Sequence, residues 1–308
     1  MQLAITDGET TRTTATGSGG STSGMGGAGG AGVGGSGGHG AAGTGGSGTG
    51  GTAGTPIADA DRDASADMTR VDADPTTFSF FVASMKAMQT LSGKTDGFGG
   101  DLRFGQSDGL SGADEICRQT AEMGVPGSGN KTWRAFLSVK QGPGGAPVNA
   151  RDRIGPGPWY DRNGRLLAAN LTDLFAGPRP KGDSALVNDM THERGEPNHY
   201  VGAGGYTSDS TVDNHDTLTG SDAMGQLRAA SVADTCNDWT SAAAATSKLS
   251  VYVGHSWPRS PSAGLQWASD HAAPGCLPDL DRTLGGTGTG ACVGCSGGYG
   301  GIYCFAVP

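Results

Sequence analysis

Residues 111–138 read SGADEICRQTAEMGVPGSGNKTWRAFLS, a helical pattern followed by a strand pattern. Ser111 belongs to the residue types that cap helices, and small or apolar residues follow it at helical spacing. These residues are Ala113, Ile116, Cys117 and Thr120. The pattern predicts an amphipathic helix over 111–123 that faces a core through Cys117 and ends at Gly124.

The second half of this stretch, 132–138, alternates between two faces. Trp133, Ala135 and Leu137 share one face, and Arg134 and Phe136 share the other. Alternation is the period of a β-strand, so we expect a central strand with one deeply buried side. Further elements are expected as a strand at 78–85, a short strand and a short helix within 166–175, and regular structure at 235–241, 249–254 and 301–306. Together these patterns predict an α+β fold.

Glycine is concentrated in one part of the chain. Of the 58 glycines, 21 fall within the 38 residues 17–54, where nearly all the other residues are Ser, Thr or Ala. Such a segment cannot bury enough apolar surface to offset the entropy lost on ordering. An acidic stretch follows at 59–74, and large apolar residues become regular only from Phe78. We therefore expect a disordered Gly-rich tether and acidic linker over 1–76 and one folded, monomeric domain over 77–308.

The net charge limits the partners that the chain can bind. With a charge of −9 and an isoelectric point near 5.0, it lacks the basic surface that displaces counterions from nucleic acids or anionic membranes. The sequence contains no run of about 18 apolar residues, so we expect no membrane span. A glycan or a surface protein is the expected partner.

All six cysteines lie in the predicted domain, at Cys117, Cys236, Cys276, Cys292, Cys295 and Cys304. An even number of cysteines without zinc-ribbon spacing is typical of disulfides in an oxidising compartment. We therefore expect an extracellular or outer cell-surface location. Residues 1–16, MQLAITDGETTRTTAT, have neither a basic start nor an apolar stretch, so we expect the true start, with a signal or lipoprotein signal, to lie upstream.

The order of several short segments carries a resemblance. Along the domain they are FFVAS, DGLSGADEIC, KTWRAFLS, NARDRIGPGPWY, HDTLTG, TCNDWTS, the GHSWP-to-WASDH region with PGC, and the closing GIYCFA. With these segments the domain resembles the bacterial endostatin-like, C-type-lectin-like proteins known from myxobacterial lipoproteins and leptospiral outer-surface proteins. The resemblance implies a C-type-lectin-like (endostatin-like) α+β domain with disulfides.

The resemblance also implies how the cysteines pair. It ties a helix-borne cysteine to the last strand, which corresponds here to Cys117 and Cys304. A second disulfide closes a nearby loop, which corresponds to Cys236 and Cys276. That leaves Cys292 and Cys295 as an extra pair inside a Gly-rich insertion, which is not part of the resemblance. A swap of Cys276 with either of them stays open, since six cysteines allow fifteen connectivities.

Glu196-Pro197-Asn198 is the tripeptide with which mannose-type C-type lectins hold calcium and sugar together. Carboxylate and amide oxygens suit calcium, which takes about six to eight oxygen ligands. Asn237 and Asp238 are the candidates to complete such a site, although Trp239 follows them here, whereas Trp precedes the Asn-Asp pair in those lectins. Calcium at Glu196 and Asn198 is therefore the one cofactor that the sequence suggests, and otherwise we expect none.

Tryptophans and histidines are the remaining candidates. Trp257 and Trp267 lie in a Gly/Pro/Ser-rich region and are candidates for a stacking surface, whereas Trp133 and Trp239 are interpreted as core residues. The five histidines of the domain are His192, His199, His215, His255 and His271. Their spacing matches no metal-site motif, so we interpret them as surface or core residues.

The candidate residues include no catalytic pattern. His192-Glu193 lacks the second histidine of H-E-x-x-H, and Ser256 lacks the glycine that follows the serine of a nucleophile elbow. We therefore expect a non-catalytic binding or adhesion module that presents the loop-rich region 176–234 to a glycan or protein ligand. The alternatives are a structural envelope component without a specific ligand and, behind it, a hydrolase.

Overall fold

The computed structural model of the protein describes residues 73–199, 214–228, 231–243, 251–258, 263–279 and 290–307, and the backbone strands at 201–202 and 206–207. All of them belong to one compact unit that covers 60–308. The predicted tether and most of the acidic linker therefore lie outside the described residues. The first described residues form a turn in which the Asp74 carboxylate accepts hydrogen bonds from Thr76 and Thr77.

The described part of the chain contains both helices and strands, which confirms the α+β class. The α-helices are α1 (Met85–Ser92), α2 (Gly109–Gly124), α3 (Leu171–Leu174), α4 (Ser184–Asn188) and α5 (Cys236–Trp239). The strands are β1 (Phe80–Val82), β2 (Thr132–Ala135), β3 (Trp159–Tyr160), β4 (Leu166–Ala168), β5 (Val201–Gly202), β6 (Tyr206–Thr207), β7 (Asp216–Leu218), β8 (Val251–His255), β9 (His271–Ala273) and β10 (Gly298–Val307).

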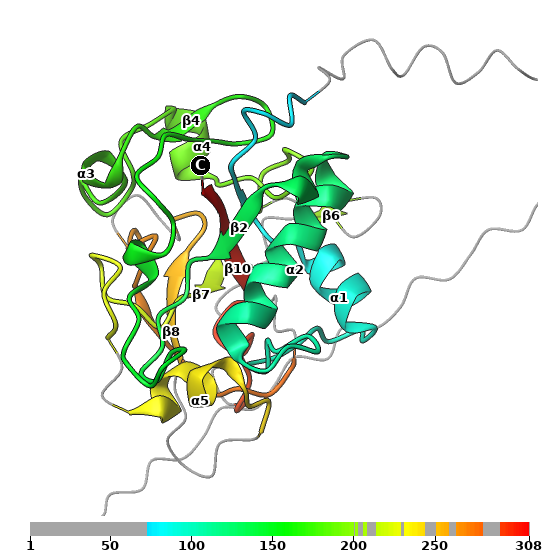
Figure 1. Ribbon diagram of the computed structural model, residues 1–308, viewed down its shortest axis with the longest axis vertical. Coiled ribbons are helices and arrows are strands. Elements are labelled where there is room, and N and C mark those ends of the chain that lie inside the picture. The colour runs from blue at the N-terminus through cyan, green and yellow to red at the C-terminus, as the bar shows by residue number, and fades with distance from the viewer. Residues whose placement is uncertain are drawn as a thin grey trace, which may run out of the picture. The chain divides into compact units, whose positions relative to one another are not determined.

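Strand β10 is the centre of the main sheet, whose order is β1-β10-β7-β8-β9. It pairs antiparallel with β1, where Cys304 lies opposite Phe81, and antiparallel with β2, where Cys304 lies opposite Ala135. Nearer its N-terminal end, β10 runs parallel to β7. Figure 1 shows α1 and α2 together on one side of β10 and β2, with α3, α4 and β4 on the other side.

Side chains that alternate between the two faces of β10 and β2 divide the buried apolar residues into two cores. Cys304 and Ala135 belong to the core that also contains the buried residues of α1 and α2. Their neighbours Tyr303, Phe305 and Phe136 belong to the second core, under α3 and α4. Because successive side chains of a strand point to opposite faces, both faces of the sheet are covered. The predicted strand is confirmed over Thr132–Ala135, but it is not central, because among the described residues it pairs with β10 alone. Phe136, which follows it on the second face, is buried as well.

Helix α2 begins earlier than the sequence pattern predicts. Its N-cap is Asp108, whose carboxylate accepts a hydrogen bond from the Ser111 backbone N–H at 2.8 Å. Ser111 therefore lies in the first turn, where its hydroxyl donates to the same carboxylate. Gly124 is the last helical residue, as predicted. The helix presents Ile116 and Cys117, both fully buried, to the first core.

The segment 176–234 departs from the expected long loop region. It contains α4 and also β7, which lies inside the main sheet between β10 and β8. All three residues of β7 are buried. A strand of three buried residues is too short to show a period in the sequence, so its pattern is that of a loop.

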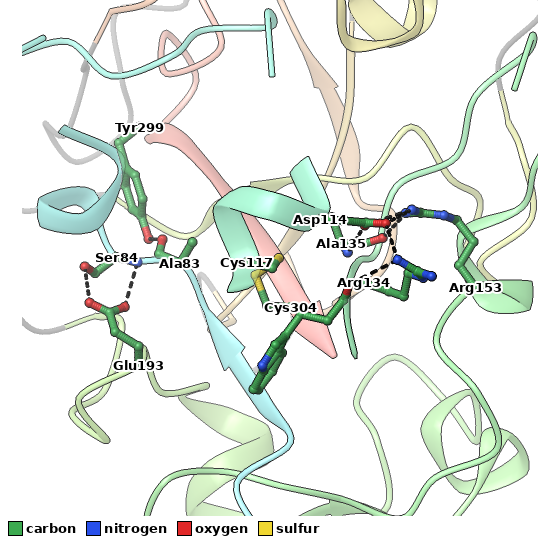
Figure 2. The surroundings of a disulfide bond; sticks show 11 residues. Ala83, Ser84, Asp114, Cys117, Arg134, Ala135, Arg153, Glu193, Tyr299 and Cys304 are labelled. Carbon is green, nitrogen blue, oxygen red and sulfur yellow. Dashed lines mark hydrogen bonds and ion pairs between the residues drawn. A yellow bond between two sulfur atoms is a disulfide. The ribbon is translucent and has the colours of Figure 1, made fainter. Parts of the chain in front are cut away.

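The described residues contain three disulfides. They are Cys117–Cys304, Cys236–Cys276 and Cys292–Cys295, the expected pairs without the swap that the sequence leaves open. The first joins α2 to β10 across 187 positions of the chain, and Figure 2 shows it between the helix and the sheet. Disulfides of this kind are typical of an oxidising compartment.

Candidate metal centre and ligand pocket

Three of the five histidines come together with an aspartate at one end of the main sheet. Asp216 on β7 lies directly opposite His255 on β8. His271 on β9 lies opposite Val253, which is two residues before His255 and therefore on the same face. His215 directly precedes Asp216 in the chain. We refer to His215, Asp216, His255 and His271 as the histidine cluster.

Oδ1 of Asp216 is close to all three imidazoles of the cluster. It lies 3.2 Å from Nε2 of His215, 3.3 Å from Nε2 of His255 and 3.2 Å from Nε2 of His271. The four nitrogen and oxygen atoms all lie within 4.8 Å of one another. His215, Asp216 and His255 are buried, whereas 35% of the His271 side chain is exposed. The cluster is thus a largely buried set of polar atoms with one side near solvent.

None of these short contacts is aligned as a hydrogen bond. In the described part of the chain, Oδ1 of Asp216 has no hydrogen-bond partner, and neither has Nε2 of His255. The atoms lie at hydrogen-bond distance, but the geometry around Oδ1 of Asp216 is not that of a hydrogen bond. Ligand atoms around an ion have this arrangement, because each one points to the shared centre.

Hydrogen bonds from outside the cluster orient two of its members. Nδ1 of His255 lies 2.9 Å from the carbonyl oxygen of Gly264. Because a carbonyl only accepts, Nδ1 carries the proton and Nε2 of the neutral ring presents its lone pair to the cluster. Oδ2 of Asp216 accepts a hydrogen bond from the Ser296 hydroxyl at 2.6 Å, which leaves Oδ1 facing the histidines. Metal-ligating histidines and carboxylates are commonly held by such outer hydrogen bonds.

The cluster attracts positive charge. Burial opposes ionisation of Asp216, but His255 and His271 beside it hold the pKa of its carboxyl at about 2. Burial also opposes protonation of His271, but Asp216 raises the pKa of that imidazole to about 8. At neutral pH the carboxylate is therefore ionised, and either a proton on His271 or a metal ion neutralises it.

Trp267 lies in the second core and packs closely against the strand that carries His255. It is fully buried, its ring centroid lies 4.9 Å from that of Phe136, and its Nε1 donates to the Leu174 carbonyl. A Cβ atom at Gly254 would lie 1.7 Å from the Trp267 carbonyl oxygen, so only glycine fits before His255. The expectation that Trp267 belongs to a stacking surface is therefore wrong, because the fully buried ring has no face open to a ligand.

Trp257 covers the histidine cluster. Its ring meets His215 edge-on at 5.0 Å and stacks on His199 at 3.9 Å. Its Nε1 donates to Oδ1 of Asn214 at 3.1 Å, and only 6% of the residue is exposed. Trp257 therefore shields His215 from solvent and presents little ring surface to an external ligand.

Glu196 and Asn198, the predicted calcium residues, have other partners. Asn198 is buried, and its Oδ1 accepts a hydrogen bond from the Tyr299 hydroxyl at 2.8 Å. Its Nδ2 donates to the Ser256 hydroxyl at 2.8 Å. Oε2 of Glu196 lies 3.2 Å from Nε2 of His192. The Asn198 oxygen therefore supports a buried network, and it does not face outward as a lectin-type calcium ligand would.

Asn237 and Asp238 lie in α5, which is one tight turn with left-handed backbone angles and no regular α-helix. Residues 236–239 all have positive φ, between 50° and 63°. The turn is fixed by the Asp238 carboxylate, which accepts hydrogen bonds from the backbone N–H groups of Lys140 and Gln141 at 2.7 and 3.0 Å. Asn237 donates to the Thr240 hydroxyl. These contacts are separate from those of Glu196 and Asn198, so the four residues do not converge on one calcium site.

A surface pocket beside α1 is the second candidate site. Its volume is about 400 Å³, and its lining includes Lys94, Phe98, Asp101, Arg103, Phe104 and Gln106. The rings of Phe98 and Phe104 meet edge to face, with centroids 5.5 Å apart. Arg103 pairs with both carboxylate oxygens of Asp101, at 2.9 and 2.6 Å. We refer to this site as the Phe104 pocket.

The sequence reading missed both sites for physical reasons. The cluster residues are brought together by cross-strand register, which leaves no local spacing to detect. The Phe104 pocket lies in a Gly-rich connection between α1 and α2 without a periodic pattern. The structure itself marks the pocket at Phe104, where a φ of 46° is rare for a bulky side chain.

Comparisons with protein-family models, curated proteins and solved structures found no match. Among the described residues, no helix combines the length and the apolar character needed to cross a membrane.

Proposed function

We propose that residues 77–308 form an extracellular or cell-surface module with a C-type-lectin-like, endostatin-like fold, which binds a glycan or a surface protein and does not catalyse a reaction. The order of the resembling segments supports this fold. So does the packing of α2 against β2, with Cys117 of the helix bonded to Cys304 of the last strand. The disulfides support a place outside the reducing cytoplasm.

The observation that carries the binding proposal is the Phe104 pocket. A bulky residue in the left-handed region costs of order 1–3 kcal/mol, and such strain concentrates at binding sites. Here the strained backbone places the Phe104 ring against Phe98, beside the ion pair of Asp101 and Arg103. Aromatic faces pack against the C–H face of a sugar ring, and charged groups pair with its hydroxyls. This combination favours a glycan as the ligand.

The experiment compares two arginine variants of the full-length, oxidised chain on a glycan array. Arg103→Ala removes a charge from the pocket, and Arg118→Ala removes one from α2, where the side chain is similarly exposed, 43% against 46%. We expect Arg103→Ala to weaken binding about 10-fold or more, because a charge-assisted hydrogen bond is lost. Arg118→Ala should bind like the wild type.

Three other outcomes contradict parts of this proposal. If both variants bind the glycan equally weakly, the Phe104 pocket is not the binding site. Cleavage of a bound glycan would favour the hydrolase alternative. If neither glycans nor outer-surface proteins are retained, the structural envelope component becomes the better interpretation.

A further inference from the structure

We propose that the histidine cluster binds one zinc ion through Nε2 of His215, His255 and His271 and Oδ1 of Asp216. The proposal goes beyond the binding function of the Phe104 pocket and does not depend on it. It rests on the positions, burial and chemistry of four side chains that the main sheet brings together.

The spacing of the ligand atoms fits tetrahedral zinc. With zinc bonds of about 2.0–2.2 Å, neighbouring ligand atoms of a tetrahedron lie about 3.3–3.6 Å apart. The distances from Oδ1 of Asp216 to the three Nε2 atoms are 3.2, 3.3 and 3.2 Å. The Asp216 oxygen thus lies close to the separation that a shared ion imposes from each of the three nitrogens, and all four atoms lie within 4.8 Å of one another.

Hydrogen bonding within the cluster does not account for this arrangement. A protonated imidazole beside a carboxylate points its N–H at the oxygen. Here three nitrogens surround one oxygen without alignment, and in the described residues both Oδ1 of Asp216 and Nε2 of His255 are buried without a hydrogen-bond partner. Burying polar atoms without a partner lowers the stability of the fold, whereas an ion between these two atoms would be a partner for both. The Gly264 carbonyl has already fixed the His255 tautomer whose Nε2 binds metal.

The donor set selects the class of metal. Imidazole and carboxylate together suit zinc and neighbouring transition metals, whereas calcium takes about six to eight oxygens. Four protein ligands fill a tetrahedral zinc ion, and catalytic zinc keeps one position open. The role that follows is structural. The ion would connect β7 and β8 to the three-residue strand β9, whose strand pairing among the described residues is with β8 alone.

The first test measures uptake of zinc and cobalt by the full-length, oxidised chain, prepared without a histidine tag and stripped with chelator. We expect one zinc ion per chain by elemental analysis. Zinc about 100-fold above its Kd should raise the melting temperature by about 5–10 °C, because the ion binds only the native state. Cobalt should give the intense visible absorption of a tetrahedral centre. Calcium should leave the melting temperature unchanged.

The second test compares two histidine variants. His271→Gln removes a ligand that is partly exposed, so the chain is expected to fold, and zinc-free melting checks this. His199→Gln is the control, because its side chain is similarly exposed, 41% against 35%, and it lies outside the cluster. We expect His271→Gln to weaken zinc binding more than 100-fold, beyond the roughly 10–100-fold effect of outer-shell changes. His199→Gln should bind zinc like the wild type.

The proposal is overturned if the folded wild type takes up no zinc, or if bound cobalt shows the weak spectrum of an octahedral site. It is also overturned if zinc binds equally well to His271→Gln, since the ion would then lie elsewhere. A melting temperature that rises with calcium and not with zinc would contradict it as well.

Discussion

Nη2 of Arg153 donates to both carboxylate oxygens of Asp114, each at 2.8 Å, and so joins the segment after β2 to helix α2 (Figure 2). The Arg153 and Asp114 side chains are only 10% and 14% exposed. Asp114 also accepts hydrogen bonds from Nη1 of Arg134 and from the Ala135 backbone N–H, both at 2.9 Å. One carboxylate thus neutralises a buried guanidinium and fixes the helix against the strand.

Replacing Asp114 should therefore be costly. Asp114→Ala leaves the buried Arg153 charge without its partner, and we expect a loss of about 3–5 kcal/mol in the free energy of unfolding. Glu115→Ala is the control on the same helix, because its pair with Arg118 is more exposed, at 25% and 43%, and contributes about 0–1 kcal/mol. Urea unfolding of both variants measures the difference. Equal losses would mean that burial of the Asp114 pair does not matter.

The long-range disulfide should contribute more stability than the short one. Cys117 and Cys304 close a loop of 188 residues, for which the chain-entropy estimate is about 5 kcal/mol. Cys292 and Cys295 close a loop of four residues, for which it is about 2 kcal/mol. We expect the double Cys→Ala variant of the first pair to be the less stable by about 3 kcal/mol. Calorimetry of the two double variants checks this, and the reverse order would contradict the loop argument.

The sequence was informative where a pattern extends over several turns or alternations. The helix containing Cys117 and the strand containing Trp133 have periods of about 3.6 and 2, long enough to detect. Trp133 and Trp239 are buried as predicted, with Nε1 atoms that donate to the backbone carbonyls of Ser128 and Ser138. These features depend on local sequence, so they could be predicted.

The candidate metal centre depends on register instead. Two strand pairings bring together Asp216, His255 and His271. Because long segments separate these residues in the chain, the sequence shows no metal-site spacing. Trp267, predicted on a surface, is buried for a related reason. Its Gly/Pro/Ser-rich neighbourhood resembles a surface loop, whereas a close approach to Gly254 of β8 draws the ring into the core. A single sequence does not contain the pairing partner that decides such positions.

Asp189 should make the stability depend on pH. Burial raises the pKa of its carboxyl to about 6, although the His199 backbone N–H and the Arg179 charge oppose this. The ordinary pKa is 3.8, so the native state holds the proton more tightly than the unfolded chain. The resulting stabilisation is complete below about pH 4 and is lost as the pH rises through about 6.

Asp189→Asn removes this loss, because the amide cannot ionise. We expect the variant to be more stable than the wild type by about 1–2 kcal/mol at pH 7.5, a figure reduced for partial exposure of the side chain. Near pH 4 the two proteins should be equally stable. Chemical unfolding across this pH range measures the difference. A variant that is less stable at pH 7.5 would show that the ionised carboxylate is stabilised in the native state.

Gly254→Ala tests how the core supports the histidine cluster. The added methyl group would lie 1.7 Å from the Trp267 carbonyl oxygen, so β8 must shift away from that segment. We expect a loss of about 1–3 kcal/mol or more in the free energy of unfolding. Because Gly254 precedes His255, the shift should also move Nε2 of that ring and weaken zinc binding about 10-fold or more.

The control for this change is Gly177→Ala, where the nearest atom to the added methyl group would be 4.0 Å away. That variant should match the wild type in both melting temperature and zinc affinity. If Gly254→Ala is destabilised but binds zinc with unchanged affinity, His255 keeps its position when β8 moves. The close contact between Gly254 and Trp267 then stabilises the core and does not position the zinc ligands. If both properties are unchanged, the packing at Gly254 is looser than the contact with the Trp267 carbonyl requires.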